Sequence, residues 1–296
     1  MFTEKRVSNP TGLCNSESVP EIAVIIPSFN TAELLARCLA TVHGEIIVAD
    51  NASHDGSPDL VATKFPTAKV IRLPVNRGYG AACNAGAKAA TADVLLFLNS
   101  DTEVQPGTLE CIANAFRQQL DLGAVACHEL SLNGRTVMGC RSHHSLRSAM
   151  SFLSGYRLFR AEGDRYQIAD WNREDDRWVD NVSGFAWAIR RATFEQLGGF
   201  DENLFLYCEE EDMALRLAKL NSRIRYLAGA RIIHAGARSS RGLGLWGRRR
   251  RWLESFVYLR RKHGQSRSAM LDRAVLYPFL VLWWVGSRLK KCYRDD

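Results

Sequence analysis

The sequence predicts an α/β fold with a mostly parallel sheet flanked by helices. Short apolar segments alternate with helix-like segments of about ten to fifteen residues, which is the pattern of strands joined by crossover helices. The apolar segments are hydrophobic at nearly every position, as expected when both faces of a sheet are covered. A chain of 296 residues with 46% hydrophobic residues can bury the core of one large domain with an appendage.

The first half of the chain contains five expected strands, with a helix after each of the first four. The first helix has Asn30 as its expected N-cap and Glu33 three residues later, which is a capping-box arrangement. The second helix is expected to begin at Ser57 with Pro58 at its first position, where proline is well tolerated. The expected strands are 22–26, 45–50, 69–73, 94–98 and 123–127.

The second half of the chain is less regular. Residues 128–180 lack clear periodicity and are rich in Arg, Ser and His, so we expect variable loops or a lid there. Order returns with a strand at 185–190, a short helix and the turn "GGFDE", and one or two strands are expected within 222–236. We therefore expect one domain over 21–240, preceded at 1–20 by a flexible polar leader without the apolar core of a signal peptide.

The tail, residues 241–296, has a composition of its own. It contains 14 Lys/Arg and 4 Asp/Glu, a net charge of +10, whereas the preceding residues carry −3. Its basic segment "WGRRRRWLESFVYLRRKHG" is followed by "AVLYPFLVLWWVG", which contains Pro278 and is too short to span a bilayer. This composition predicts an amphipathic helical tail at a membrane interface. A helix pair packed on the domain is the alternative. Nucleic-acid binding would explain the arginines but not the tryptophans, so no nucleic-acid partner is expected.

Cysteine and glycine patterns argue against several other classes of protein. The eight cysteines are scattered and form no C-x-x-C pair, so neither a zinc site nor a disulfide framework is indicated. We therefore expect a reduced, cytoplasmic protein. The segment "RGYGAACNAG" departs from the dinucleotide fingerprint because Cys83 occupies the third glycine position, which disfavours a nicotinamide enzyme. Gly78 and Gly80 still allow close approach of a ligand.

Polar side chains follow the expected strands, at the edge where parallel sheets bind ligands. Asp50 ends one strand and is a candidate ligand contact, whereas Asp55 reads equally well as a helix cap. Asn99 and Asp101 lie two residues apart after another strand, and with the oxygens of a diphosphate they would hold Mg²⁺. His234, after the apolar run "ARII", is either a further metal ligand or a structural residue.

Four consecutive carboxylates, Glu209 to Asp212, stand in "FLYCEEEDMALRL" at the start of a helix-like pattern. Acidic residues are favoured in the first turn of a helix, and Asp212 is four residues before Arg216, so part of this cluster is explained by local structure. Glu209 and Glu210 have no such local partner. The sequence therefore leaves a functional role open for these two residues.

Seven segments of the chain, which appear in the family's order, resemble the family 2 glycosyltransferases with the GT-A fold, especially the rhamnosyltransferase-like branch. They cover roughly residues 20–240, and together they are far more specific than any one alone. The resemblance implies a GT-A, Rossmann-like sheet. The segments are "VIIPSFN", "EIIVADNASHDGS", "NRGYGAACNAG", "LFLNSDTEV", "VSGFAWAIRRATFEQLGGFDE", "FLYCEEEDMALRL" and "IIHAGARSS".

The resemblance also implies roles for individual residues. Glu210 would be the catalytic base, but the family pair is usually Glu-Asp and here it is Glu-Glu, so Glu209 stays a candidate. Asp101, Asn99 and His234 would hold Mg²⁺ or Mn²⁺ on the diphosphate. The acceptor site would include Gly184 and Trp187. Donor-binding residues would be Pro27, Asn30, Asp50, Asn51, Arg77, Gly78, Asn84, Asn99 and Ser100.

The implied reaction is inverting transfer of a sugar from a nucleotide-diphosphate donor, and the rhamnosyltransferase-like branch makes rhamnose the candidate sugar. The acceptor would be a hydroxyl of a saccharide or of a polyprenyl-diphosphate-linked saccharide in cell-surface polysaccharide assembly, at the inner face of the cytoplasmic membrane. Two alternatives keep the fold: a non-catalytic nucleotide-sugar-binding scaffold, and a nucleotidyltransferase that makes sugar nucleotides.

Overall fold

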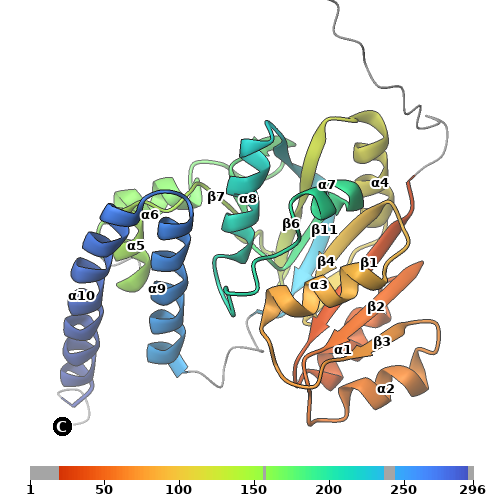
Figure 1. Cartoon of the computed structure of the whole chain (residues 1–296), viewed down its shortest axis with the longest axis horizontal. Coiled ribbons are helices and arrows are strands. Elements are labelled where there is room, and N and C mark those ends of the chain that lie inside the picture. The colour runs from red at the N-terminus through yellow and green to blue at the C-terminus, as the bar shows by residue number, and fades with distance from the viewer. Residues whose placement is uncertain (1–19, 156–157, 237–243, 293–296) are drawn as a thin grey trace, which may run out of the picture.

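A computed structural model describes residues 20–155, 158–236 and 244–292. Figure 1 shows a central sheet with helices on both faces, and a helical pair, α9 and α10, to one side of it. The expected α/β class and the mostly parallel sheet are therefore confirmed. The expected leader and part of the segment "IIHAGARSS" lie outside the described residues.

The sheet has nine strands within the described residues, eight of them in the order β3-β2-β1-β4-β10-β6-β11-β5, while β8 pairs with β11. Six strands share one direction, and β10, β5 and β8 run against them. A separate pair is formed by β7 (Cys140–Arg141) and β9 (Asn181–Val182). The strands of the sheet are β1 (Ile22–Ser28), β2 (Glu45–Asp50), β3 (Lys69–Arg72), β4 (Val94–Leu98), β5 (Thr102–Val104), β6 (Leu122–Ser131), β8 (Arg177–Val179), β10 (Ala186–Arg190) and β11 (Arg223–His234).

Two hydrophobic cores fill the two faces of this sheet. One lies under α1 (Ala32–Leu39), α2 (Ser57–Lys64) and α4 (Thr108–Gln118). The other lies under α3 (Tyr79–Ala89), α7 (Arg191–Gln196) and α8 (Glu209–Lys219). Because both faces are covered, the central strands are buried along nearly their whole length, as their apolar sequences indicated.

The start of α1 differs from the prediction. Asn30 is not its N-cap; that position is Thr31, which makes no side-chain capping bond. Asn30 adopts a positive φ of 53° and accepts a hydrogen bond from His54 N at 2.8 Å. The amide of Ala32 is satisfied instead by Asp55, at 2.8 Å. A distant carboxylate thus takes over the capping role that the local sequence assigned to Asn30 and Glu33.

Residues 128–180 contain more regular structure than the expected loops. Strand β6 continues to Ser131, and two helices follow, α5 (Leu146–Leu153) and α6 (Arg160–Gln167). The prediction of loops was wrong for the two helices, because they are short and depend on tertiary packing: α5 packs on the tail, and α6 packs on α5. A role of this segment as a lid remains a prediction.

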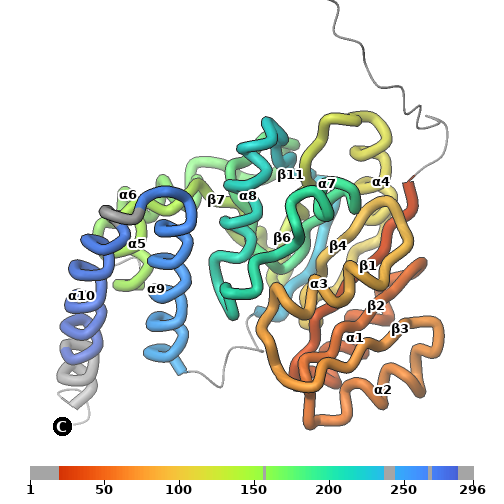
Figure 2. Tube along the Cα trace, in the orientation of Figure 1, coloured from red at the N-terminus to blue at the C-terminus, as the bar shows by residue number. Residues whose placement is uncertain are grey.

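The tail forms two helices, α9 (Gly244–Lys262) and α10 (Ser266–Cys292). Figure 2 shows both beside α5 and α6, away from the sheet. A third hydrophobic core joins them to the domain: Trp252, Leu253 and Phe256 of α9 pack with Leu204 and Cys208, just before α8. The alternative in which the tail packs on the domain is therefore realised for α9. Among the described residues, no helix is both long and apolar enough to cross a membrane.

Candidate active site

A cavity of about 250 Å³ opens at the carboxyl ends of β1, β2 and β4, the edge at which parallel sheets bind ligands. Its wall combines apolar rings with amide, hydroxyl and carboxylate groups, the mixture expected for a small-molecule site. Five of the predicted donor-binding residues line it. The lining residues are Pro27, Ser28, Phe29, Asn51, Asn76, Gly78, Tyr79, Asn99, Ser100, Asp101, Phe205 and Leu206.

Asn51 and Gly78 shape this cavity. The side-chain amide of Asn51 donates to Gly78 O at 2.9 Å, and its oxygen accepts from Arg77 N at 3.2 Å. Gly78 has a φ of 91°, and a Cβ there would lie 2.3 Å from Phe205 O. Only glycine permits this approach of the two loops. Asn51 therefore positions the loop before α3, and its amide is already engaged.

Asp101 lies against His234 because β5 pairs with the end of β11. His234 Nε2 is 3.1 Å from Asp101 Oδ1, and its Nδ1 is 2.6 Å from Glu129 Oε1. Burial would lower the pKa of His234, but the hydrogen bonds to the two carboxylates raise it to about 9. Sequence reasoning missed Glu129, which lies just past the expected end of its strand. Its carboxylate fixes the orientation of the imidazole ring.

The donor atoms near this pair suit a divalent cation. A carboxylate at Asp101 and the side chain of Asn99 in the same cavity are oxygen ligands of the type that Mn²⁺ accepts. His234 would add a nitrogen ligand only by losing the proton that the two carboxylates stabilise. Among the described residues there is no group of three or more His, Cys, Asp or Glu side chains arranged for a metal. The cation would thus need ligand oxygens from a bound diphosphate, as the sequence indicated.

Four predicted donor residues do not line the cavity. Asn30 contacts the 53–54 loop, and Arg77 forms an ion pair with Glu202 on the surface. Asn84 lines a different hollow, between α3 and α7. There its side-chain amide donates to Phe200 O and its oxygen accepts from Phe200 N. Asp50 is buried, and its Oδ2 accepts from Ser53 N at 3.0 Å.

The carboxylates at the start of α8 separate into four different surroundings. The helix follows two residues with left-handed backbone, Tyr207 and Cys208, a strain of about 1–3 kcal/mol each that is often found at functional sites. Glu211 accepts a hydrogen bond from His144 N at 2.9 Å, and Asp212 pairs with Arg216 at 2.7 Å. These two side chains therefore serve the structure, and Glu209 and Glu210 do not share their partners.

Glu209 and Glu210 differ in exposure. Glu209 is buried and its Oε1 has no hydrogen-bond partner among the described residues, whereas Glu210 is partly exposed. Burial and then the charge of Glu210 raise the pKa of Glu209 well above its usual range. Burial also raises the pKa of Glu210, to about 7, against the opposing effect of Arg141. Glu210 is thus the carboxylate that is accessible and titrates near neutral pH.

A two-residue segment, Gly184–Phe185, connects Glu210 to the cavity. A Cβ on Gly184 would lie 1.5 Å from Glu210 Oε1, so the carboxylate occupies the space that the missing side chain leaves. Gly184 O accepts from Tyr79 of the cavity wall at 2.9 Å. The ring of Phe185 stacks on His234 at 5.7 Å between centroids, and Phe185 O accepts from Asn99 N at 2.8 Å.

Glu210 is not among the residues that line the cavity. This short segment links it, through Gly184, to Phe185, which contacts Asn99 and His234, the partner of Asp101. Trp187, the other predicted acceptor residue, is 1% exposed and packs in the core against Phe97 and Phe200. It contributes to the packing beneath the site and offers no surface to an acceptor. Tyr79 was missed because only Arg77 and the two glycines of "RGYG" were considered in the sequence, and not the aromatic side chain between them.

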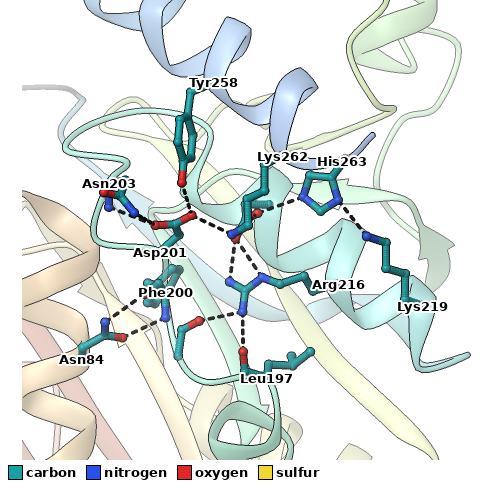
Figure 3. A network of polar contacts seen from close by, with 12 residues as sticks. Asn84, Leu197, Phe200, Asp201, Asn203, Arg216, Lys219, Tyr258, Lys262 and His263 are labelled. Carbon is teal, nitrogen blue, oxygen red and sulfur yellow. Dashed lines mark hydrogen bonds and ion pairs between the residues drawn. The ribbon is translucent and has the colours of Figure 1, made fainter. Parts of the chain in front are cut away.

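A polar network fixes α8 to the tail (Figure 3). Asp212 is fully buried and contacts Lys262 at 2.8 Å and His263 at 2.9 Å, in addition to Arg216. Asp201 of the "GGFDE" turn bonds to Lys262 and to the hydroxyl of Tyr258. The helix that carries Glu210 is thus held by α9 as well as by its own domain.

Comparison with known proteins agrees with this geometry. The model of the family described as Glycosyl transferase family 2 matches residues 23–198. An N-acetylglucosaminyl-diphospho-decaprenol L-rhamnosyltransferase of Mycobacterium tuberculosis is 28% identical over 237 residues, which are 74% of this chain and 77% of that protein. The O-antigen biosynthesis protein RfbC of Myxococcus xanthus is 29% identical over 75% of this chain and 18% of its own length.

Solved structures of glycosyltransferases share the fold. GalNAc-T7 with UDP, GalNAc and Mn²⁺ superposes with a TM-score of 0.60 at 16% identity, over 83% of this chain and 48% of that one. The mannosyltransferase PcManGT of Pyrobaculum calidifontis, with GDP-Man and Mn²⁺, superposes with a TM-score of 0.57 at 19% identity, over 95% of this chain and 79% of that one. The expected GT-A fold is confirmed. Because the family model spans more than half of the sequence, the chain belongs to glycosyltransferase family 2.

Proposed function

We propose that the chain transfers a sugar, rhamnose in the first instance, from a nucleotide-diphosphate donor to a hydroxyl of a lipid-linked saccharide, with inversion. The proposal is supported by the rhamnosyltransferase relative, whose name specifies a decaprenol diphosphate acceptor. Relatives named for O-antigen and succinoglycan biosynthesis support a role in cell-surface polysaccharide assembly. The reaction would take place at the inner face of the cytoplasmic membrane.

The donor would bind in the cavity at the ends of β1, β2 and β4. The loop before α3, which Asn51 holds by hydrogen bonds, and the rings of Phe29 and Phe205 would hold the nucleoside. The diphosphate would then point toward Asp101. Mg²⁺ or Mn²⁺ held there would neutralise the charge that develops on the leaving diphosphate. Mn²⁺ is named with two structural neighbours, which supports a metal requirement. In this chain Asp101 and Asn99 would provide oxygen ligands, and Glu129 would keep His234 oriented toward Asp101.

Glu210 would act as the general base. Its carboxylate would take the proton of the acceptor hydroxyl while that oxygen attacks the anomeric carbon from the face opposite the leaving diphosphate. One C–O bond forms and another breaks, so the configuration at that carbon inverts. The observation that carries this proposal is the Gly184–Phe185 segment, in which Gly184 contacts Glu210 while Phe185 contacts His234 and Asn99.

We propose the following division of the chain. Residues 21–240 would form the transferase domain, with 128–180 contributing to acceptor choice as a lid. Residues 241–296 would be the membrane-associated tail. This division is supported by the hydrogen bond from His144 N to Glu211 and by the ion pair of Lys262 with Asp212, which attach both segments to the helix that carries the candidate base.

The test compares two glutamine variants. Donor hydrolysis and transfer are measured over a panel of nucleotide sugars with Mn²⁺, and donor affinity is measured in parallel. Glu210→Gln is expected to reduce transfer about 10²- to 10⁴-fold with unchanged donor affinity, because only the proton acceptor is lost. Glu209→Gln is expected to have a much smaller effect, because the raised pKa already favours the neutral acid that glutamine imitates.

Full turnover by Glu210→Gln would refute the role of this residue. Absence of turnover with every donor, despite donor binding, would favour a non-catalytic scaffold. Formation of a sugar nucleotide from a nucleoside triphosphate would instead favour a nucleotidyltransferase.

A further inference from the structure

The helix α10 presents an apolar stripe to solvent, which we call its outer face. It consists of Leu271, Val275, Pro278, Leu282 and Val285. These residues are spaced four, three, four and three apart, so they lie on one side of the helix. Leu271 and Leu282 are 67% and 72% exposed, and Val275 and Val285 are each 43% exposed. Over these turns the stripe extends about 21 Å along the helix.

The opposite side of α10 is fixed to the rest of the protein. Leu276 and Leu280 are fully buried in the third core, against α9 and α5. Asp272 is buried and accepts a hydrogen bond from Arg260 of α9 at 2.8 Å. The orientation of α10 is thus set by packing and by an ion pair. Its outer face points away from the domain as a defined surface.

Charge indicates what covers this face. The tail carries +10, while the segment 274–287 contains no charged residue. A second copy docked on the outer face would bring two such tails together, and the like charges would repel. An anionic lipid surface attracts the same tail, with about 1 kcal/mol for each Lys or Arg close to it.

The surroundings of α10 match a helix that lies in the plane of an interface. Trp246 and Trp284 are in contact, with ring centroids 5.4 Å apart, and Arg249 lies 3.7 Å from the ring of Trp283. Tryptophan and arginine gather at the level of lipid head groups. Since no described helix can cross a bilayer, the stripe is suited to lying on a membrane and not to spanning it.

We propose that the outer face of α10 is the membrane-contact surface of the protein, inserted between the head groups of an anionic bilayer. This proposal rests on the proposed function in one respect, that a lipid-linked acceptor gives the contact its purpose. Few contacts separate this surface from the candidate site. Helix α10 packs on α9, and Lys262 of α9 forms an ion pair with Asp212 of α8, two residues after Glu210.

The experiment uses the full chain and two pairs of exposed leucines. Leu271→Glu/Leu282→Glu places charge on the outer face, and Leu120→Glu/Leu220→Glu is the matched control, at residues 76% and 38% exposed on the transferase domain. Binding is measured by co-sedimentation with phosphatidylglycerol vesicles and with phosphatidylcholine vesicles. We expect wild type and control to bind the anionic vesicles, and the outer-face variant to bind at least tenfold more weakly.

Equal vesicle binding by the outer-face variant and the wild type would overturn the proposal, as would a wild type that binds neither kind of vesicle. Size-exclusion chromatography tests the competing occupant, because a dimeric wild type that the outer-face variant converts to a monomer would also overturn it. Donor hydrolysis is measured in the same samples and should be unchanged in both variants. A chain that binds vesicles through this face but hydrolyses no donor would refute the proposed function alone.

Discussion

At the scale of single residues, Glu209 and Glu210 show how adjacent carboxylates acquire different chemistry. Neighbouring positions on a helix point about 100° apart, so one side chain enters the interior and the other faces the space beside Gly184. Burial raises the pKa of both, but only Glu210 remains accessible to an acceptor. Burial and contact therefore favour Glu210 in the choice that the sequence left open, and its role as the base stays a prediction.

The raised pKa of Glu210 predicts the pH dependence of transfer. A general base works in its deprotonated form, so kcat/KM should rise with pH and level off above about 7. Below that pH it should fall about tenfold for each unit. Initial rates between pH 5 and 9 test this, with donor affinity measured at each pH to separate changes at the metal site. A profile that is flat through neutral pH would exclude Glu210 as the titrating base.

Substitution of Gly184 should damage catalysis without removing any reactive group. In Gly184→Ala the new Cβ would lie 1.5 Å from Glu210 Oε1, so the carboxylate must move. A displacement of about 1 Å at a reacting group can cost about 10²-fold in rate. We expect a loss of kcat of that order with unchanged donor affinity. Gly229→Ala is the control, because its Cβ would meet only Cys111 Sγ, at 3.3 Å.

The sequence predicted those site residues that have a local signal. Asn99 and Asp101 were found because they follow a buried strand directly, and the structure places both in the cavity wall. Glu129 and Phe205 were not found, because their positions depend on the pairing of β11 with β5 and β6 and on the approach of Phe205 to Gly78. Asn84 was assigned to donor binding because it lies in a segment that resembles the family, whereas its side chain forms two hydrogen bonds with the backbone of Phe200.

At the scale of elements, α8 is held from both of its sides. Three basic side chains converge on the fully buried Asp212: Arg216 on the helix itself, Lys262 at the end of α9, and His263 just after it. Lys219 lies 3.2 Å from the other ring nitrogen of His263. The helix that carries Glu210 is therefore attached to the tail by charged hydrogen bonds two residues from this carboxylate.

Removal of the Asp212 carboxylate should destabilise the fold. Asp212→Ala leaves three basic groups without their buried partner, and losing one partner of a buried ion pair typically costs about 3–5 kcal/mol. The control is Asp59→Ala, which breaks an exposed pair with Arg72 and should change stability by less than about 1 kcal/mol. Urea denaturation measures both. Similar midpoints for the two variants would contradict a supporting role for Asp212.

The elements that sequence reasoning predicted well are those with strong internal periodicity. Strands β1 to β4 and the helices between them were expected within a few residues. Strand β5 was missed because its three residues form a strand only by pairing with β11, more than a hundred residues later. The helices α5 and α6 were missed for a related reason, since α5 packs on the tail and α6 packs on α5.

At the scale of the whole molecule, two covered sheet faces and a third core form one continuous body. The third core contains residues from α5, the 204–208 segment, α9 and α10. The expected boundary near residue 240 separates compositions, but the hydrophobic interior continues across it. The net charge differs between the domain and the tail, but the packing of hydrophobic side chains does not separate them.

A chain truncated before α9 is expected to fold poorly, because the third core would lose the residues that α9 and α10 contribute. A chain ending at residue 243 would expose Leu204 and Cys208, and Asp201 and Asp212 would lose their partners on α9. We expect low soluble yield and a melting temperature well below that of the full chain, measured by differential scanning fluorimetry. A truncated protein that melts like the full chain would show that the third core adds little stability.

The attachment of Asp201 and Asp212 to Lys262 also limits how such a protein can be recombined. A chimera that borrows the last two helices of a relative inherits their cations but not the acidic residues that complement them. Grafts that transplant 201–212 together with those helices should assemble, while grafts of the helices alone should misfold.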